Sequence, residues 1–323
     1  MTENILKYPD IEWSLPLLFY SDYIYGAICN AFKAANMPAP KANIFGTPSC
    51  LWSGGRRPSC YEEFQRHKFA KLLKYITFSG GIPSFTFTSV GLTKDDIKDP
   101  YCNMLLDVAL EENARFIVFD DRLRDHIKSK KADAIVVASI IKPIFEFQDF
   151  SKKKEYLVEE ETAYYNKLLK EYDVAVVRPE YSKYALVQNP SIIDDISRIE
   201  VLINQQCTLN CPRAVAHYSS FEEMKNDKGK KVPFQCYRAI VPAVKHYDYD
   251  INSFHDEQSL QKLTSAGVKR LKVQGRSLPL TPAEVYLNTI NHIVKYAGSG
   301  YIFFEHIVPR INDELNFYRR FIA

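Results

Sequence analysis

The sequence predicts a single α/β domain of 323 residues, folded as a TIM-like (β/α)8 barrel with a helical extension over residues 1–40. Three observations support this fold class. Short strand-like runs alternate with helical stretches, the strands are apolar on both faces, and eight such strands occur. An open doubly wound sheet is disfavoured, because no G-x-G-x-x-G motif follows the first strand.

The expected elements follow one another at regular intervals. Strands rich in β-branched and aromatic residues are expected at 42–47, 84–89, 115–120, 134–139, 174–179, 200–205, 238–244 and 268–275. Helices with apolar residues every three to four positions are expected at 62–76, 103–112, 122–130, 160–172, 190–198, 253–267 and 311–322. The extension, with LPLLFYSDYIYGAICNAF, is expected to cover the bottom or side of the barrel.

Composition limits the class of protein. Hydrophobic residues make up 46% of the chain and the formal net charge is +3, which is too small to require a nucleic-acid partner. No apolar run approaches the roughly 20 residues of a membrane span. Seven cysteines without a secretory leader favour reduced thiols over a disulfide framework. We therefore expect a soluble cytoplasmic protein with no membrane partner.

The segment LINQQCTLNCPRAVAHY contains the most informative cysteines. Cys207 and Cys211 follow a predicted strand, and Cys236 closes a lysine-containing stretch, 218–236, that is expected to form a basic lid loop. Three cysteines can hold an iron–sulfur cluster or a zinc ion. We predict these three as metal ligands of a [4Fe–4S] cluster, with Zn²⁺ as the alternative cofactor. The alternative without a functional role is that these cysteines are buried or incidental thiols.

The loops that follow barrel strands place further polar residues at one mouth, where barrel enzymes carry their chemistry. The predicted catalytic residues are His217, Arg213 and Arg276. The predicted substrate-binding residues are Arg56, Arg57, Arg178, Asn204 and Lys272. Arginines bind phosphate or carboxylate groups, and the preceding Gly54 and Gly55 let the backbone approach a ligand closely.

Simpler structural roles remain open for several of these residues. Arg178 and Glu180 can pair with each other, Asp120 and Asp121 can form the N-cap of the next helix, and His217 can be a buried, hydrogen-bonded histidine. Cys102 is expected to be a buried helical cysteine, with a fourth metal ligand as the alternative.

The segment 266–296 resembles the collagenase-like peptidase family. The resemblance rests on KVQGR at 272–276, followed by Tyr286, and extends loosely over residues 40–300. It implies a barrel-like fold with a [4Fe–4S] cluster, because relatives in that family are iron–sulfur proteins of RNA base or ubiquinone ring hydroxylation. This chain differs from the family in its cysteine spacing and in Gln274, where an acidic residue is usual.

We therefore predict an iron–sulfur-dependent enzyme of the oxidoreductase or transferase type that modifies a nucleobase or another planar anionic metabolite. A small molecule or RNA is its expected substrate, and an electron or sulfur donor protein its expected partner. One alternative is a peptidase-like hydrolase that pairs Cys207 or Cys211 with His217. The other is a non-catalytic, zinc-braced barrel that binds RNA or protein, with bases stacking on aromatic residues of segment 246–254.

Overall fold

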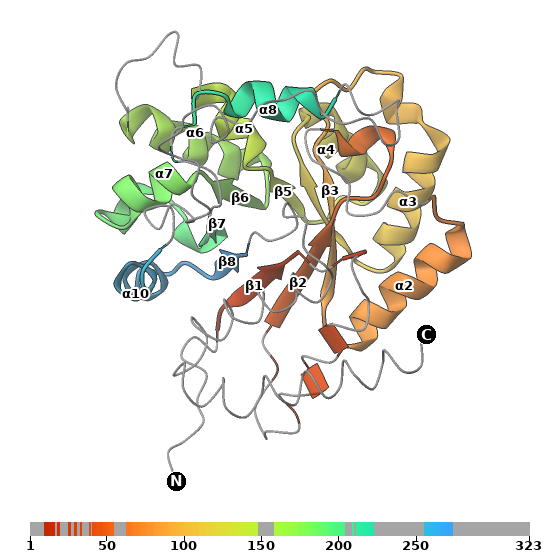
Figure 1. Cartoon of the computed structure of the whole chain (residues 1–323), viewed down its shortest axis with the longest axis horizontal. Helices are drawn as coiled ribbons and strands as arrows, with labels where there is room; N and C mark the ends of the chain where they lie inside the picture. Colours follow the sequence, from red (N-terminus) through yellow and green to blue (C-terminus); the bar gives the residue numbers. More distant parts are fainter. Residues whose placement is uncertain are drawn as a thin grey trace, which may run out of the picture.

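The structure is a computed structural model of the chain. It describes residues 10–16, 18–19, 25–26, 29–30, 33, 39, 41–54, 63–147, 158–203, 209, 211–222 and 255–273. In this part of the chain, eight strands form a closed barrel in the order of the sequence (Figure 1). The prediction of a TIM-like barrel is confirmed.

All neighbouring strands of the barrel are parallel. They are β1 (Glu12–Leu15), β2 (Lys41–Gly46), β3 (Ile82–Phe87), β4 (Arg115–Val118), β5 (Val136–Ala138), β6 (Val174–Val177), β7 (Ile199–Leu202) and β8 (Arg270–Lys272). The ring closes where β8 pairs with β7 on one side and with β1 on the other. The carboxyl ends of all eight strands therefore open at one mouth.

The first strand differs from the sequence prediction. Residues 12–15, assigned to a helical extension, form β1 and pair with β2 and β8. The described residues at 25–26, 29–30 and 33 are helical, and they lie in the crossover from β1 to β2. The expected strand at 238–244 lies outside the described residues, and the ring is complete without it because β7 pairs directly with β8.

Helices connect the strands on the outside of the barrel. The longer ones are α2 (Arg66–Phe78), α3 (Pro100–Glu111), α4 (Asp121–Lys130), α5 (Ile141–Phe147), α6 (Val158–Glu171), α8 (Ala214–Ser220) and α10 (Glu257–Ser265). Asp99 and Asp120 cap α3 and α4, each accepting a backbone N–H of the first turn. The predicted helix at 190–198 is instead two 3₁₀ turns, η4 (Pro190–Ile192) and η5 (Ile196–Arg198). None of the helices in the described ranges could span a bilayer.

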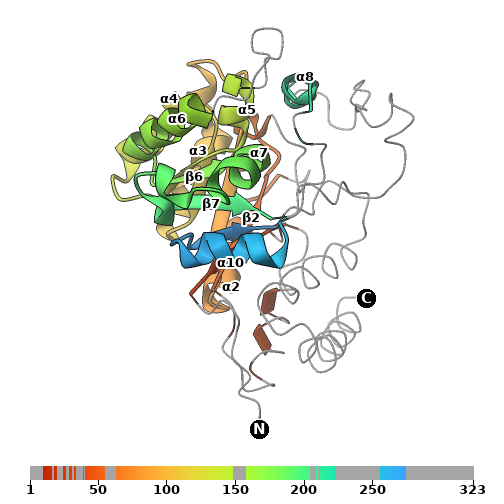
Figure 2. The same cartoon turned by 90° about the vertical axis from the view of Figure 1, so that its left-hand side faces the viewer.

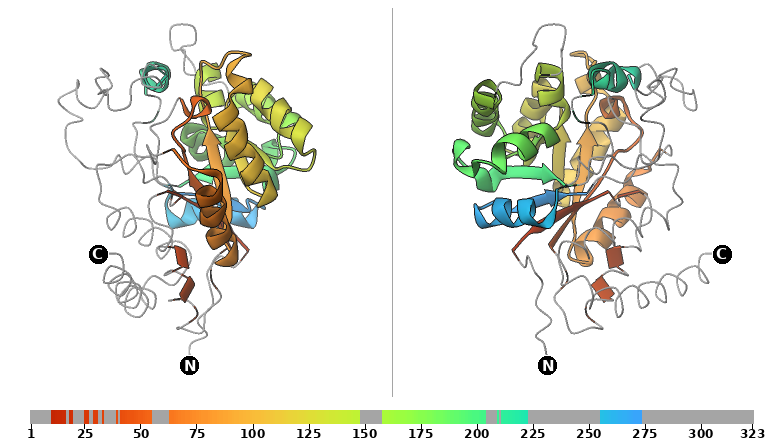
Figure 3. Two further views of the ribbon diagram at one scale, coloured as in Figure 1. Left: turned by 90° about the vertical axis from the view of Figure 1, so that its right-hand side faces the viewer. Right: turned by 60° about the vertical axis from the view of Figure 1, so that its left-hand side comes forward.

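Strand alternation divides the apolar side chains into two clusters. The larger one fills the layer between strands and helices, and includes Trp13, Phe85 and Val201. Figures 2 and 3 show helices of this layer, with α10 beside β7 and β8 and with α2 and α3 against the strands on the other side. The smaller cluster contains the alternate strand residues, among them Phe45 and Leu202, which fill the barrel interior.

Candidate functional site

A chain of hydrogen bonds crosses four adjacent strands inside the barrel. The Asn43 amide of β2 donates to Ser14 Oγ of β1 at 3.0 Å, and the Ser14 hydroxyl donates to Glu200 Oε1 of β7. The second oxygen, Glu200 Oε2, accepts from Lys272 Nζ of β8 at 3.0 Å. All four residues are buried, and these hydrogen bonds give each of them a polar partner within the barrel.

Lys272 is the member of this hydrogen-bond network that lies nearest the mouth. It is the last residue of β8 and pairs in register with Leu202, the last residue of β7. Its ammonium lies 4.3 Å from the ring centroid of Phe45, a distance at which the ring face attracts a cation. The structure therefore places a buried positive charge at the carboxyl end of the strands.

Two polar atoms beside this hydrogen-bond network have no hydrogen-bond partner among the described residues. They are Asn43 Oδ1 and Ser84 Oγ, both with almost no exposed surface. Ser84 pairs in register with Phe45 of the neighbouring strand, so both atoms belong to the β2–β3 side of the interior. Burial of an unpaired polar atom costs about 1–3 kcal/mol, and such atoms are suited to hold a water or a ligand.

The short helix α8, here called the mouth helix (Ala214–Ser220), covers the interior cluster. Its residues Ala214, Val215 and Tyr218 pack against that cluster, and α8 lies near α5 (Figure 1). The predicted catalytic residues Arg213 and His217 are its N-cap residue and a residue of its last turn. The His217 ring stacks on Tyr218 and lies 5.1 Å from the ring of Phe221.

The cysteines of the described chain do not assemble a metal site. Cys211 precedes the mouth helix, whereas the two other predicted ligands, Cys207 and Cys236, lie outside the described residues. Among the residues placed by the structure, no three His, Cys, Asp or Glu side chains could hold a metal ion together. The fit of a [4Fe–4S] cluster or a zinc ion to its three predicted ligands therefore rests on the sequence alone.

Cys102 is fully buried on the first turn of α3, beside the partly buried Cys50. Burial and the neighbouring Cys50 raise the pKa of the Cys102 thiol. Burial opposes ionisation of Cys50 as well, but hydrogen bonds with Cys102 and Ser53 lower its pKa. Its sulfur lies 3.1 Å from Ser53 Oγ. Cys102 is thus a core residue of α3, as the simpler interpretation predicts.

Arg178 follows β6 and is buried against helix α6. Its guanidinium donates to both oxygens of Glu161, at 2.8 and 2.7 Å, and its backbone N–H donates to Tyr165 Oη at 2.9 Å. Burial opposes the charge, but the Glu161 carboxylate raises the pKa of Arg178 above its ordinary value. This pair ties α6 to the end of β6, and a substrate-binding role of Arg178 stays a prediction.

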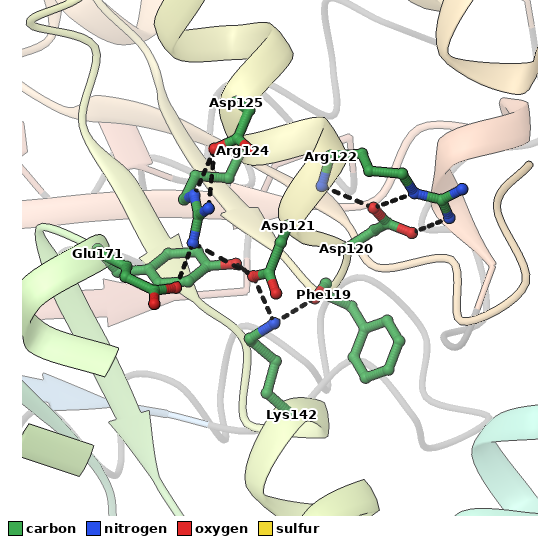
Figure 4. A network of polar contacts seen from close by, with 9 residues as sticks. Phe119, Asp120, Asp121, Arg122, Arg124, Asp125, Lys142 and Glu171 are labelled. Atoms are coloured by element: carbon green, nitrogen blue, oxygen red, sulfur yellow. Dashed lines mark hydrogen bonds and ion pairs between the residues drawn. The ribbon is translucent and has the colours of Figure 1, made fainter. Parts of the chain in front are cut away.

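Asp120 and Asp121 follow β4 and stabilise the surrounding helices. Asp120 binds the backbone and side chain of Arg122, whereas Asp121 accepts from Lys142 Nζ at 2.8 Å and from Tyr172 (Figure 4). Partial burial opposes ionisation of Asp121, but these hydrogen bonds lower its pKa. The N-cap interpretation describes Asp120 correctly.

The remaining predicted residues, Arg56, Arg57, Asn204 and Arg276, lie outside the described residues, as does most of the predicted lid loop 218–236. Conversely, sequence reasoning missed Ser14, Asn43 and Glu200. Only Glu200 leaves a signal in the sequence, because a carboxylate inside an otherwise apolar strand needs a partner.

No protein-family model and no curated protein matches this sequence. Among solved structures, the U32 peptidase Mk0906 is similar with a TM-score of 0.47 and 12% identity, over 81% of this chain and 91% of that chain. The C-terminal domain of a putative chitinase from Desulfitobacterium hafniense DCB-2 has a TM-score of 0.36 and 12% identity, over 88% and 98% of the two chains. Similarities this remote leave the function open.

Proposed function

We propose that this chain is an enzyme that binds a small anionic metabolite at the mouth of the barrel, with Lys272 as the cationic anchor. One observation carries the proposal, namely the buried ion pair between Lys272, at the carboxyl end of β8, and Glu200, the second residue of β7. Such a pair costs desolvation free energy, so it is weak evidence for a stabilising role. At the mouth of a barrel it is well placed to bind substrate.

The neighbouring groups suit this role. One oxygen of Glu200 accepts a hydrogen bond from the Lys272 ammonium. The other oxygen accepts from Ser14, which in turn accepts from Asn43, so the carboxylate that orients Lys272 is itself held in position. The ammonium donates hydrogen bonds and carries a full positive charge, and both properties attract a carboxylate or phosphate group. The Phe45 ring beneath it excludes water and strengthens attraction to an anion.

A binding measurement tests the proposal. We expect calorimetry to find a carboxylate or phosphate metabolite, within a panel of such compounds, that binds the wild type and is lost in Lys272→Met. Lys269, exposed just before the same strand, is the matched control, and Lys269→Met should bind normally. Lys272→Met leaves the buried Glu200 carboxylate without its ammonium partner, which can prevent folding. The double variant Lys272→Met/Glu200→Gln removes that charge as well and serves as the folded form of the test. Equal binding by the folded double variant would refute the anchor.

The iron–sulfur chemistry predicted from the sequence is a separate part of the proposal. It requires Cys207, Cys211 and Cys236 to come together, because these three thiolates would hold the cluster. Anaerobically purified protein should contain iron and sulfide, and Cys207→Ala should lose both. Zinc in place of iron would favour the zinc-braced binding barrel, and absence of both metals would leave the peptidase-like alternative.

A further inference from the structure

The carboxylate of Glu222 occupies a cradle formed by the loops that follow β2 and β3. Glu222 lies two residues beyond the mouth helix. Its Oε1 accepts the backbone N–H of Val90 at 2.6 Å, and its Oε2 accepts the hydroxyl of Ser89 at 3.1 Å. A Cβ at Gly54 would lie only 1.9 Å from Oε1, so the absent side chain makes room for the carboxylate. Gly54, Ser89 and Val90 are here called the carboxylate cradle.

The cradle is held in place by contacts other than those of Glu222. The Ser89 N–H donates to the Trp52 carbonyl at 3.0 Å, and the Thr88 hydroxyl donates to the Gly54 carbonyl at 3.2 Å. Trp52 is fully buried, and its indole N–H donates to the Asp96 carbonyl at 2.7 Å. The two loops therefore support each other, and the cradle is expected to persist when the carboxylate leaves.

Glu222 follows the mouth helix, and within the part of the chain that the structure describes, the helix meets the barrel interior through partly buried apolar side chains. Val90 packs against the same interior cluster, which also contains Phe45, and Lys272 lies over the Phe45 ring. The cradle and the proposed cationic anchor thus border one apolar surface at the mouth.

We propose that the carboxylate cradle is the subsite for a substrate carboxylate, and that Glu222 fills it from within the chain while the mouth helix is closed. This inference deepens the proposed function and rests on it, because the cradle binds a substrate only if the chain is an enzyme. A ligand carboxylate can accept the hydrogen bonds that Val90 and Ser89 donate to Glu222, so the charge in the cradle is the same after the exchange, and the mouth helix is released from the cradle. The substrate class is then a small carboxylate whose apolar part covers the interior cluster.

Acetate is the probe that tests the cradle by itself. In Glu222→Ala, acetate should shift the ¹⁵N–¹H resonance of Val90 in a saturable way, whereas the wild type and the control Glu159→Ala, which removes an exposed carboxylate, should show no saturable shift. Adding Ser89→Ala to Glu222→Ala should weaken acetate about tenfold, the usual effect of one hydrogen bond to a charged group.

Gly54 supplies the decisive variant. Its backbone angles, φ −58° and ψ 177°, are open to any residue, so Gly54→Ala is expected to fold. In Glu222→Ala/Gly54→Ala, the new methyl group should abolish the acetate response. Absence of saturable binding in Glu222→Ala, or unchanged binding after Gly54→Ala, would overturn the cradle. If acetate binds as expected while Lys272→Met leaves metabolite binding intact, the cradle stands and the proposed anchor falls.

Discussion

His255 is a buried histidine that connects three elements. Its backbone N–H donates to the Ile203 carbonyl at 3.0 Å, after β7, and its Nε2 lies 2.8 Å from the hydroxyl of Ser182. It directly precedes Asp256, the N-cap residue of α10. Burial, assisted by the charge of Lys183 and opposed by Asp256, lowers the pKa of His255 from 6.5 to about 4.

This lowered pKa predicts a loss of stability in mild acid. Below about pH 6.5 the unfolded chain takes up a proton on His255, whereas the folded protein stays neutral there down to about pH 4. The free energy of unfolding should therefore fall across that window by about 3 kcal/mol in total, and this contribution is complete above it. Urea unfolding at several pH values should show a shallower fall in His255→Gln.

The exposed His67 on α2 provides the matched control for this experiment. His67→Gln should keep the wild-type pH profile. An identical profile for His255→Gln would contradict the prediction.

Single residues also show where sequence reasoning ends. Lys272 was predicted as a substrate-binding residue within a strand expected at 268–275, whereas β8 ends at Lys272. Glu222 was missed, because its partner Val90 is 132 residues away and no local pattern links them. Ser14 was missed for another reason: the four-residue strand that carries it did not stand out from the predicted extension.

At the scale of elements, strands with several β-branched residues were predicted well. β6 and β7 begin within one residue of their predicted starts, because runs such as VAVV are buried on both faces. The segment 190–198 has helical spacing of apolar residues, but Pro190 and two aspartates favour tight turns, and 3₁₀ turns form instead. Local residue preferences thus determined which type of secondary structure these short segments form.

The attachment of α6 to the barrel depends on the buried pair of Glu161 and Arg178. Glu161→Gln should lower the free energy of unfolding by about 3–5 kcal/mol, because it removes the carboxylate that accepts two hydrogen bonds from the buried Arg178 guanidinium. Denaturant unfolding measures the loss. Asp95, which pairs with Lys98 on the surface, is the control, and Asp95→Asn should cost less than about 1 kcal/mol. Similar losses in the two variants would contradict a stabilising role of the Glu161–Arg178 pair.

At the scale of the whole molecule, one ion-pair cluster joins distant strands at the end of the barrel opposite the mouth. Glu12 of β1 binds Arg115 of β4 through both carboxylate oxygens, and Arg270 of β8 lies 3.6 Å from the same carboxylate. β1 and β4 are not neighbours in the ring, so the contact crosses the interior. The sequence predicts the closed ring but not this contact, because its partners are far apart along the chain.

Removal of this carboxylate should weaken the entire barrel. Glu12→Gln leaves two arginines close together in the interior, and we expect the midpoint of denaturant unfolding to fall by an amount equivalent to about 3 kcal/mol. Glu111, exposed and paired with Arg66 on the surface, is the control. Glu111→Gln should change stability by less than about 1 kcal/mol. A Glu12→Gln protein as stable as the wild type would exclude a role of the cluster in closing the ring.

The pairing of β1 with β8 has a consequence for biosynthesis. Of the eight barrel strands, β1 is translated first, and its second partner, β8, is made only after the six strands between them. Until then the nascent sheet carries two open edges, each a template for pairing with another polypeptide. We therefore expect the growing chain to be most prone to aggregation just before residues 270–272 emerge. Chaperone binding should have its largest effect on folding yield at this stage.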